Sequence, residues 1–232
     1  MTIDRRTDRP LAAALLVMAS STASAVDFSG TATVTSDYVL RGISQSQGDP
    51  AVQLGARLAS ASGLYASLWG SQVDFGPALG TDAEIDAAVG FNRTFGERWN
   101  VDLNLTRYFY SGTRDDTNLD YNEVIATLTL DQRWWVLAAW SNDVFATGAR
   151  GLYSEIGARF PLDTRWRLEA VAGYYDLAQA YDDNYARAQL SAIYRIGAVD
   201  LRAAAHWTSD AADVLFPELS GDGVEIAATW NF

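Results

Sequence analysis

Apolar and polar side chains alternate residue by residue in many separate segments of this chain, and helical periodicity is missing. In the segment 99–107, for example, Val101 and Leu103 lie on one face while Asp102 and Asn104 lie on the other. A spacing of two is the period of a β-strand. Twelve segments follow the pattern, and we expect strands at 28–36, 50–59, 64–73, 82–92, 99–109, 122–130, 134–141, 152–160, 166–175, 185–195, 199–208 and 224–232.

The connections between these segments alternate between short and long, and this separates two classes of β-protein. Apolar and polar residues also alternate along the strands of a soluble sandwich, so alternation alone does not distinguish a sandwich from a membrane barrel. The short connections are 60–63, 93–98, 131–133, 161–165 and 196–198, and the longer ones are 37–49, 74–81, 110–121, 142–151, 176–184 and 209–223. Short turns at one rim and long loops at the other are typical of outer-membrane barrels.

Aromatic residues gather at the ends of the segments, where a membrane barrel meets the lipid headgroups. The short-turn end carries Phe28, Phe91, Trp99, Trp134, Phe160, Trp166, Tyr194 and Trp230. The long-loop end carries Trp140, Tyr174 and Trp207, with Tyr38, Tyr108, Phe109, Tyr110, Tyr175 and Tyr185 near by. We therefore predict an all-β fold: a transmembrane, antiparallel up-and-down barrel of about 12 strands over residues 26–232.

The last segment alternates up to the final residue, with Trp230 and Phe232 on its apolar face. Because a free sheet edge in lipid would leave backbone groups unpaired, we expect this strand to pair with the first one. The ending also resembles the terminal signature of outer-membrane proteins, which implies recognition of Trp230 and Phe232 by the barrel-insertion machinery.

The first 25 residues have the pattern of a secretory signal peptide. Arg5, Arg6 and Arg9 precede the apolar run 11–19, and a small-x-small sequence ends at Ala25. The run of nine residues is too short for a membrane-spanning helix. The alternative is an amphipathic helix at the start of a cytosolic protein. We expect cleavage after Ala25 and export to the outer membrane of a Gram-negative bacterium.

Composition excludes several functions. The 232 residues contain no cysteine, so sites that need a thiolate are excluded. The net charge of -12 disfavours a nucleic-acid partner. His206 is the only histidine and lies on the polar register, and no G-x-S-x-G motif is present, so we expect neither an enzyme nor a cofactor. The segment 116–120 matches the start of a calcium loop but lacks its glycine and final glutamate, which favours a solvated loop.

Residues 33–75 carry short motifs whose order and spacing are similar to those of the TorF porin family of proteobacteria. The matching residues include Asp37, Tyr38, Arg41, Gly42, Ser44, Gln45, Pro50, Gly63, Tyr65 and Trp69. Ser67 stands where that family usually has glycine. The resemblance implies an outer-membrane barrel of the porin class, and it supplies neither a substrate nor catalytic residues.

The polar register of the predicted strands defines the candidate pore lining. It carries Arg57, Glu84, Asp86, Asp102, Glu123, Glu155, Arg159, Arg167, Glu169, Arg187, Asp200, Arg202 and Glu225. Walls of charge select solutes by charge, but opposite charges on neighbouring strands also pair with each other. Two further questions stay open: whether Arg41 and Gly42 fold the first long loop into the pore, and which face of segment 64–73 points inward.

The sequence thus predicts a porin-like channel for passive diffusion of small polar or charged solutes, with a modest cation preference. Twelve strands lie between barrels filled by side chains and open aqueous channels, so we expect a narrow pore. The alternatives are a lipid-modifying enzyme of the outer membrane and a structural or adhesion barrel with a sealed lumen. Expected partners are outer-membrane lipid and lipopolysaccharide, the insertion machinery and small solutes, while association of protomers stays open.

Overall fold

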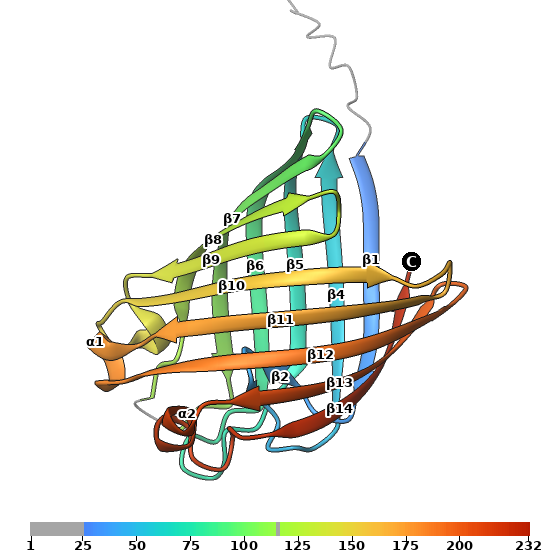
Figure 1. Ribbon diagram of the computed structural model, residues 1–232. Coiled ribbons are helices and arrows are strands. Elements are labelled where there is room, and N and C mark those ends of the chain that lie inside the picture. The colour runs from blue at the N-terminus through green and yellow to red at the C-terminus, as the bar shows by residue number, and fades with distance from the viewer. Residues whose placement is uncertain (1–25, 115–116) are drawn as a thin grey trace, which may run out of the picture.

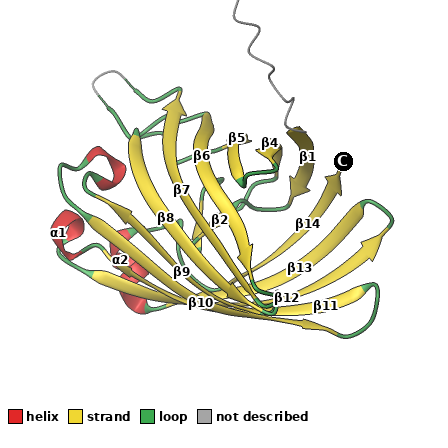
Figure 2. Cartoon of the chain, turned by 90° about the horizontal axis from the view of Figure 1, so that it is seen from above, coloured by secondary structure: helices red, strands yellow, loops and turns green. Residues whose placement is uncertain are grey.

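The computed structural model describes residues 26–114 and 117–232, and within them twelve strands close into an antiparallel barrel (Figures 1 and 2). In chain order the wall consists of β1 (Val26–Thr35), β4 (Ala51–Ser60), β5 (Leu64–Gln72), β6 (Ala83–Phe95), β7 (Trp99–Ser111), β8 (Tyr121–Leu130), β9 (Trp134–Ser141), β10 (Gly151–Pro161), β11 (Trp166–Asp176), β12 (Asn184–Ile196), β13 (Val199–Thr208) and β14 (Gly223–Asn231). Each strand pairs with its sequence neighbour, and β1 pairs with β14.

The predicted fold class is therefore confirmed, and the twelve predicted segments correspond one by one to the wall strands. The predicted signal peptide, 1–25, lies outside the described residues. None of the helices that the structure describes is long and apolar enough to cross a membrane.

The long loops contain short elements that the sequence analysis treated only as loops. The first loop forms a hairpin of β2 (Val39–Leu40) and β3 (Ile43–Ser44). Later loops contain η1 (Val144–Ala146), α1 (Ala178–Tyr181) and α2 (Asp210–Leu215). Each is at most six residues long, too short to show helical periodicity in the sequence. They lie at the end of the barrel opposite the short turns, and Figure 1 shows α1 and α2 at that same end.

The apolar face of the wall points outward and the polar face points inward. Leu54 on β4, Leu68 on β5 and Ile156 on β10 expose 61%, 59% and 59% of their surface. Glu84, Glu123 and Glu225 lie on the opposite, inner face of their strands and are only 0%, 1% and 2% exposed. This arrangement is the reverse of a soluble sandwich, whose apolar faces are covered. It suits a wall with lipid on one side and a polar lumen on the other.

The structure corrects the placement of several aromatic residues at the long-loop end. Trp140, Tyr174 and Trp207 point outward as expected of a girdle. Tyr38, Tyr108, Tyr110, Tyr175 and Tyr185 instead belong to buried clusters or pack against them. The physical reason is the strand period: in the run 108–110, Phe109 faces outward, so its two neighbours must face inward.

The orientation of β5 is also resolved by the register. Leu64, Ala66 and Leu68 face outward, while Tyr65 is buried on the inner face. Leu68 pairs with Ala87 and Leu64 with Phe91, which continues the outer apolar face onto β6. Trp69 lies on the register of Tyr65 and packs edge-on against the ring of Tyr38, with ring centroids 5.3 Å apart.

The seam between β1 and β14 closes the sheet. Thr31–Thr35 pairs with Ala227–Asn231, and beyond this ladder Gly30 and Phe232 exchange backbone hydrogen bonds of 2.7 and 3.0 Å. The Phe232 ring covers Gly30 so closely that a Cβ there would overlap the ring. Phe232 also packs against Trp230, with centroids 4.7 Å apart. Closure therefore depends on a glycine that makes room for the last aromatic side chain.

We expect Gly30→Val to weaken this seam by about 1–3 kcal/mol, the usual cost of overpacking. The measurement is the urea midpoint of the folded, heat-modifiable band in gels. Ala126→Val is the matched control, since Ala126 is exposed on the outer face of β8, away from the seam. Equal midpoints for the two variants would contradict the role assigned to Gly30.

Candidate functional site

The first long loop, residues 36–50, turns inward and carries Arg41 to two distant parts of the wall. Arg41 and Gly42 form the two-residue turn between β2 and β3, and both have positive φ, 53° and 86°. Tight hairpins favour this backbone because its twist matches that of the flanking strands. Glycine is needed at position 42 because a Cβ there would lie 2.8 Å from the Thr208 methyl group. The open question about this loop is thereby answered: it enters the barrel.

Arg41 forms a bidentate ion pair with Glu123 of β8. Its two terminal nitrogens donate to the two carboxylate oxygens at 2.8 and 2.7 Å. The side chains are only 9% and 0% exposed, so water screens the pair weakly. Tyr108 donates a further hydrogen bond of 3.0 Å to the same carboxylate. Buried charges persist when they are paired and hydrogen-bonded in this way.

Strands from the second half of the chain, β10, β11 and β12, contact the same arginine. The Tyr175 hydroxyl on β11 accepts a hydrogen bond from Arg41 at 3.0 Å, and Tyr185 on β12 donates to the Arg41 carbonyl at 3.1 Å. The guanidinium lies 4.6 Å from the ring centroid of Tyr153 and 5.0 Å from that of Tyr175. These distances fit cation–π contacts. Arg41 therefore links the first loop to β8, β10, β11 and β12 across the inside of the barrel.

Residues of the TorF-like motif build the support for this loop. Asp37 accepts hydrogen bonds from the hydroxyls of Ser44 and Ser46 at 2.6 and 3.0 Å. Gln45 donates to the Ile43 carbonyl at 3.0 Å. Tyr38 is buried in the loop. Pro50 is exposed just before β4. Gly63 lies outside the loop, in the turn before β5, where its φ is 97°. The part of the motif that lies in the first loop, residues 37–46, therefore shapes the hairpin that presents Arg41.

All the candidate pore-lining residues lie on the inner register of the wall, and most of them pair with one another. The ion pairs are Arg57–Asp102 (3.9 Å), Arg159–Glu169 (2.7 Å), Arg167–Glu169 (3.2 Å), Arg167–Asp200 (3.1 Å), Arg187–Glu155 and Arg202–Glu225. Of the two interpretations left open by the sequence, pairing across strands describes these side chains. Whether they line a conducting pore stays a prediction.

Glu84 and Asp86 differ from this pattern. Among residues 26–114 and 117–232 neither carboxylate forms an ion pair with an arginine. Glu84 accepts a hydrogen bond of 3.1 Å from the Tyr110 hydroxyl. One oxygen of each carboxylate, Oε2 of Glu84 and Oδ1 of Asp86, is buried without a hydrogen-bond partner. The acidic excess of the lumen is therefore concentrated on β6.

Aromatic side chains of the inner register are the main site residues that the sequence analysis missed. Tyr153 lies between Arg187 and Glu155, accepting at 2.7 Å and donating at 2.6 Å. The Trp135 indole donates to Glu155 at 2.9 Å and lies over Gly157, where a Cβ would overlap the ring. For Tyr153 the available signal was its register, which it shares with Glu155 and Arg159, whereas segment 134–141 has no charged residue to mark Trp135.

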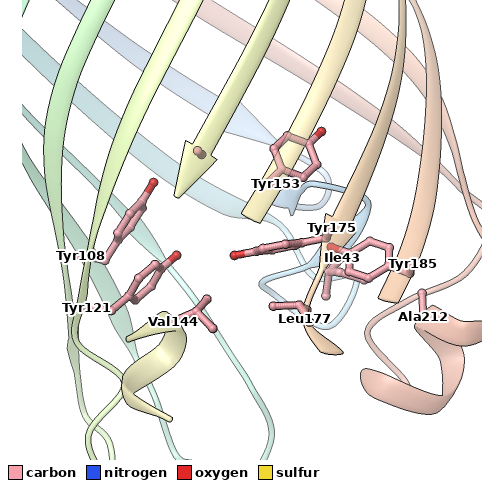
Figure 3. Close-up of a cluster of buried hydrophobic side chains, with 10 residues drawn as sticks. Ile43, Tyr108, Tyr121, Val144, Tyr153, Tyr175, Leu177, Tyr185 and Ala212 are labelled. Carbon is pink, nitrogen blue, oxygen red and sulfur yellow. The ribbon is translucent and has the colours of Figure 1, made fainter. Parts of the chain in front are cut away.

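A cluster of buried residues spans the long-loop end of the barrel (Figure 3). The phenyl ring of Phe145 in η1 packs against Tyr121 and Tyr175 with centroids 5.1 and 6.3 Å apart. It also contacts Tyr181 of α1 and the ring of Phe216, just after α2. We call this group the outer aromatic cluster. It joins strands and loops that are distant in sequence, and Arg41 lies beneath it.

His206 lies on the inner face of β13 and is 7% exposed. Its ring covers Gly223, and its Nδ1 is buried without a partner. In the described part of the chain no group of three or more metal-binding side chains is close enough to hold an ion. The calcium-like segment 116–120 falls partly outside the described residues, because positions 115 and 116 are not described.

Charged residues at the short-turn rim are exposed and pair locally. Arg98 and Asp131, from neighbouring turns, form two hydrogen bonds of 2.7 Å, and the arginine lowers the pKa of the Asp131 carboxyl from its usual value. Backbone N–H groups of Trp166 and Arg165 likewise lower the pKa of Asp163. Such exposed pairs contribute little to stability, which makes them suitable controls for the buried ones.

Comparison with solved structures shows a common fold at very low identity. The chain matches a NanC porin with a TM-score of 0.59 and 9% identity, over 88% of this chain and 99% of that chain. It matches a KdgM porin with a TM-score of 0.58 and 7% identity, over the same shares. A KdgM porin in complex with disordered oligogalacturonate matches with a TM-score of 0.54 and 6% identity, over 90% of this chain and 99% of that chain. At such identities the likeness shows the fold alone.

Sequence comparisons are less specific about activity. One family model, described as a bacterial protein of unknown function (Gcw_chp), matches residues 19–231. No curated protein matches the chain. These matches do not confirm the TorF resemblance of residues 33–75.

The buried Arg41–Glu123 pair yields a prediction for stability. We expect Glu123→Gln to lower the free energy of unfolding by about 3–5 kcal/mol, because it leaves the buried Arg41 guanidinium without its counter-charge. The double variant Arg41→Gln, Glu123→Gln should recover part of that loss, since neither charge remains. Urea unfolding in detergent, followed by tryptophan fluorescence, measures both. Asp131→Asn, at the exposed pair, should change stability by less than about 1 kcal/mol. An equal loss of stability in Glu123→Gln and Asp131→Asn would show that the buried pair contributes no more than the exposed one.

Proposed function

The chain belongs to the Gcw_chp family of bacterial proteins of unknown function, and we propose that it is an outer-membrane channel of the porin type for passive diffusion of small polar or charged solutes. The observation that carries this proposal is the distribution of side chains on the closed barrel, apolar outside and ionised inside. Lipid can solvate such an outer face, and charged walls suit the passage of polar solutes. No cofactor or catalytic group is needed for diffusion.

The structural neighbours support the solute class in general terms. The KdgM and NanC structures are named as porins, and one KdgM structure contains oligogalacturonate. A porin of this fold can therefore form a complex with a polar solute. We extend to this chain only the broad class, small polar or charged solutes.

Arg41 and its partners form the proposed constriction. The pair with Glu123 and the hydroxyls of Tyr108 and Tyr175 bring polar groups from both sides of the lumen to one level. A solute that passes this level exchanges hydration for contacts with fixed donors and acceptors. The charge of Arg41 is neutralised by Glu123, so this level by itself favours neither sign.

We further propose a modest cation preference that arises on β6. Glu84 and Asp86 have no arginine partner among the described residues, and one oxygen of each is buried without a hydrogen-bond partner, whereas the other inner carboxylates pair with arginines. An unpaired carboxylate attracts cations and repels anions over about one Debye length, roughly 10 Å at 0.1 M salt.

The cellular setting that we propose follows the sequence. Residues 1–25 act as a signal peptide that is cleaved after Ala25, and Trp230 and Phe232 serve the insertion machinery of a Gram-negative outer membrane. The TorF resemblance of residues 33–75 favours the same setting. Lipid and lipopolysaccharide then contact the outward apolar face.

The direct test is the conductance of the refolded chain in planar lipid bilayers. We expect discrete channel openings, and we expect Arg41→Ala to raise the single-channel conductance severalfold because it empties the constriction. Arg98→Ala removes the same charge from the exposed short-turn rim and should leave conductance unchanged. Absence of current from all three proteins would reject the channel and favour the sealed structural barrel.

A second test concerns ion selectivity. Under a gradient from about 0.1 to about 1 M KCl the reversal potential should indicate cation preference, weaker when both sides are at high salt. The double variant Glu84→Gln, Asp86→Asn should move this potential toward zero. Asp131→Asn, which removes a carboxylate outside the lumen, is the control. Anion preference in the unaltered chain would contradict the proposal.

A further inference from the structure

Arg57 of β4 differs in its contacts from the other arginines of the candidate pore lining. Its guanidinium lies 3.9 Å from Asp102, beyond hydrogen-bond distance, and donates no hydrogen bond to any residue that the structure describes. The other arginines, 159, 167, 187 and 202, each donate to a carboxylate. The Arg57 side chain is 36% exposed on the inner face, so its N–H groups are accessible from the lumen.

The aspartate beside Arg57 receives its hydrogen bonds from other side chains. Tyr65 and Asn104 donate to Oδ1 of Asp102 at 2.8 and 3.1 Å. Asn92 donates to Oδ2 at 2.9 Å. Both carboxylate oxygens are therefore satisfied without the arginine, and Asp102 acts on Arg57 only through its charge.

The ring of Tyr65 holds the guanidinium in place. Arg57 lies over this ring, 3.3 Å from its centroid, which is a cation–π contact. One flat face of the guanidinium is covered in this way, while its N–H groups lie along its edges. Because the contact restricts the side chain before any solute arrives, less entropy is lost when a solute binds to it.

Hydroxyl groups from two neighbouring strands flank Arg57. The register pairs Arg57 with Ser29 of β1 on one side and with Ser67 of β5 on the other, and Thr31 follows Ser29 on the inner face. Within residues 26–114 and 117–232 these hydroxyls form no hydrogen bond with the protein, whereas the next one along β1, Thr33, bonds to Thr229 at 2.9 Å. Arg57 and its neighbours thus present polar groups that the protein itself leaves free.

These side chains line a hollow of about 410 Å³. Gly55 forms part of its floor, because a Cβ there would lie 2.6 Å from Oγ1 of Thr31 and 3.3 Å from the Trp69 ring. Sites for small molecules usually have volumes of roughly 300–1,000 Å³. The hollow therefore has the size of a small-solute site, with a free guanidinium and free hydroxyls on its walls.

The chemistry of the hollow selects a carboxylate. A guanidinium offers paired N–H groups whose spacing matches the two oxygens of a carboxylate. Arg57 carries one positive charge, and Asp102 at 3.9 Å repels a second negative charge, so a monoanion is favoured over a phosphate dianion. Hydroxyls both donate and accept hydrogen bonds, which suits further hydroxyl groups on the same solute.

We infer that this hollow binds a small hydroxylated carboxylic acid, with the carboxylate on the Arg57 guanidinium and the hydroxyl groups of the solute on Ser29, Thr31 and Ser67. The inference rests on the proposed function, because it names a solute class for the channel. Its contacts are few and open to the lumen, so a bound solute can leave again. Ion selectivity is a separate property, since it reflects the summed charge of the whole lumen.

The test compares D-glucuronate with D-glucose, which has the same ring but no carboxylate. The refolded chain in detergent is titrated with each sugar, and binding is followed by saturation-transfer NMR. We expect saturable binding of glucuronate and binding of glucose that is about tenfold weaker or more, the contribution of a hydrogen bond to a charged group. Equal affinities would overturn the inference. Equal or tighter binding of D-glucose 6-phosphate would overturn the choice of a carboxylate.

Variants of the guanidinium test its role. Arg57→Gln should weaken glucuronate binding about tenfold or more. Arg57→Lys keeps the charge but loses the planar pair of donors, so its affinity should lie between those of Arg57→Gln and the unaltered chain. Arg98→Gln removes the same charge from the exposed short-turn rim and should leave binding unchanged. Equal weakening in Arg57→Gln and Arg98→Gln would indicate unspecific charge attraction and would overturn the inference.

A variant that keeps Arg57 tests the hydroxyls. The double variant Ser29→Ala, Ser67→Ala should weaken glucuronate binding about twofold to tenfold, the contribution of neutral hydrogen bonds. Acetate, which has a carboxylate but no hydroxyl, should bind equally to this variant and to the unaltered chain. The same loss for both probes would overturn the role assigned to these serines.

The outcomes also separate this site from the proposed channel. Glucuronate binding that depends on Arg57, without bilayer current, would retain the site and reject the channel. Current without such binding would retain the channel and reject the site.

Discussion

The constraint on which the whole structure depends is that lipid offers no hydrogen bonds to a polypeptide backbone. A sheet in such a medium cannot keep an open edge, so β1 must pair with β14 however weak the local sequence preference at the seam. Closure in turn creates an inside, and the strand period assigns alternate residues to it. The outward leucines and inward carboxylates are consequences of this closed geometry.

The interior is arranged as a set of paired charges supported by aromatic rings. Arginines reach across one or more strands to carboxylates, and tyrosine and tryptophan side chains donate to the remaining oxygens, as Trp135 and Tyr153 do at Glu155. Pairing lowers the cost of placing ions in a narrow, poorly hydrated space. Glu84 and Asp86 on β6 are the inner carboxylates that, in the described part of the chain, this network of ion pairs leaves without an arginine partner.

The sequence was sufficient for the wall because each strand carries its own local signal. The alternation at 99–107 indicates both a strand and its two faces, and β7 follows that assignment. The site depended on information that is not local. Arg41 is 82 residues from Glu123 and 134 from Tyr175, and no spacing rule connects them. The run 108–110 was misassigned for a simpler reason: all three residues are aromatic, so composition hid the alternation of faces.

The reach of Arg41 also has a consequence for assembly. Its partners on β8, β11 and β12 are made after the hairpin that carries it, so the first loop has nowhere to dock until most of the wall has formed. Contacts between residues so far apart in sequence form late in folding, because the intervening chain must first be ordered. Docking of the loop therefore depends on wall strands that come later in the chain, and the contacts of Arg41 are complete only once those strands are in place.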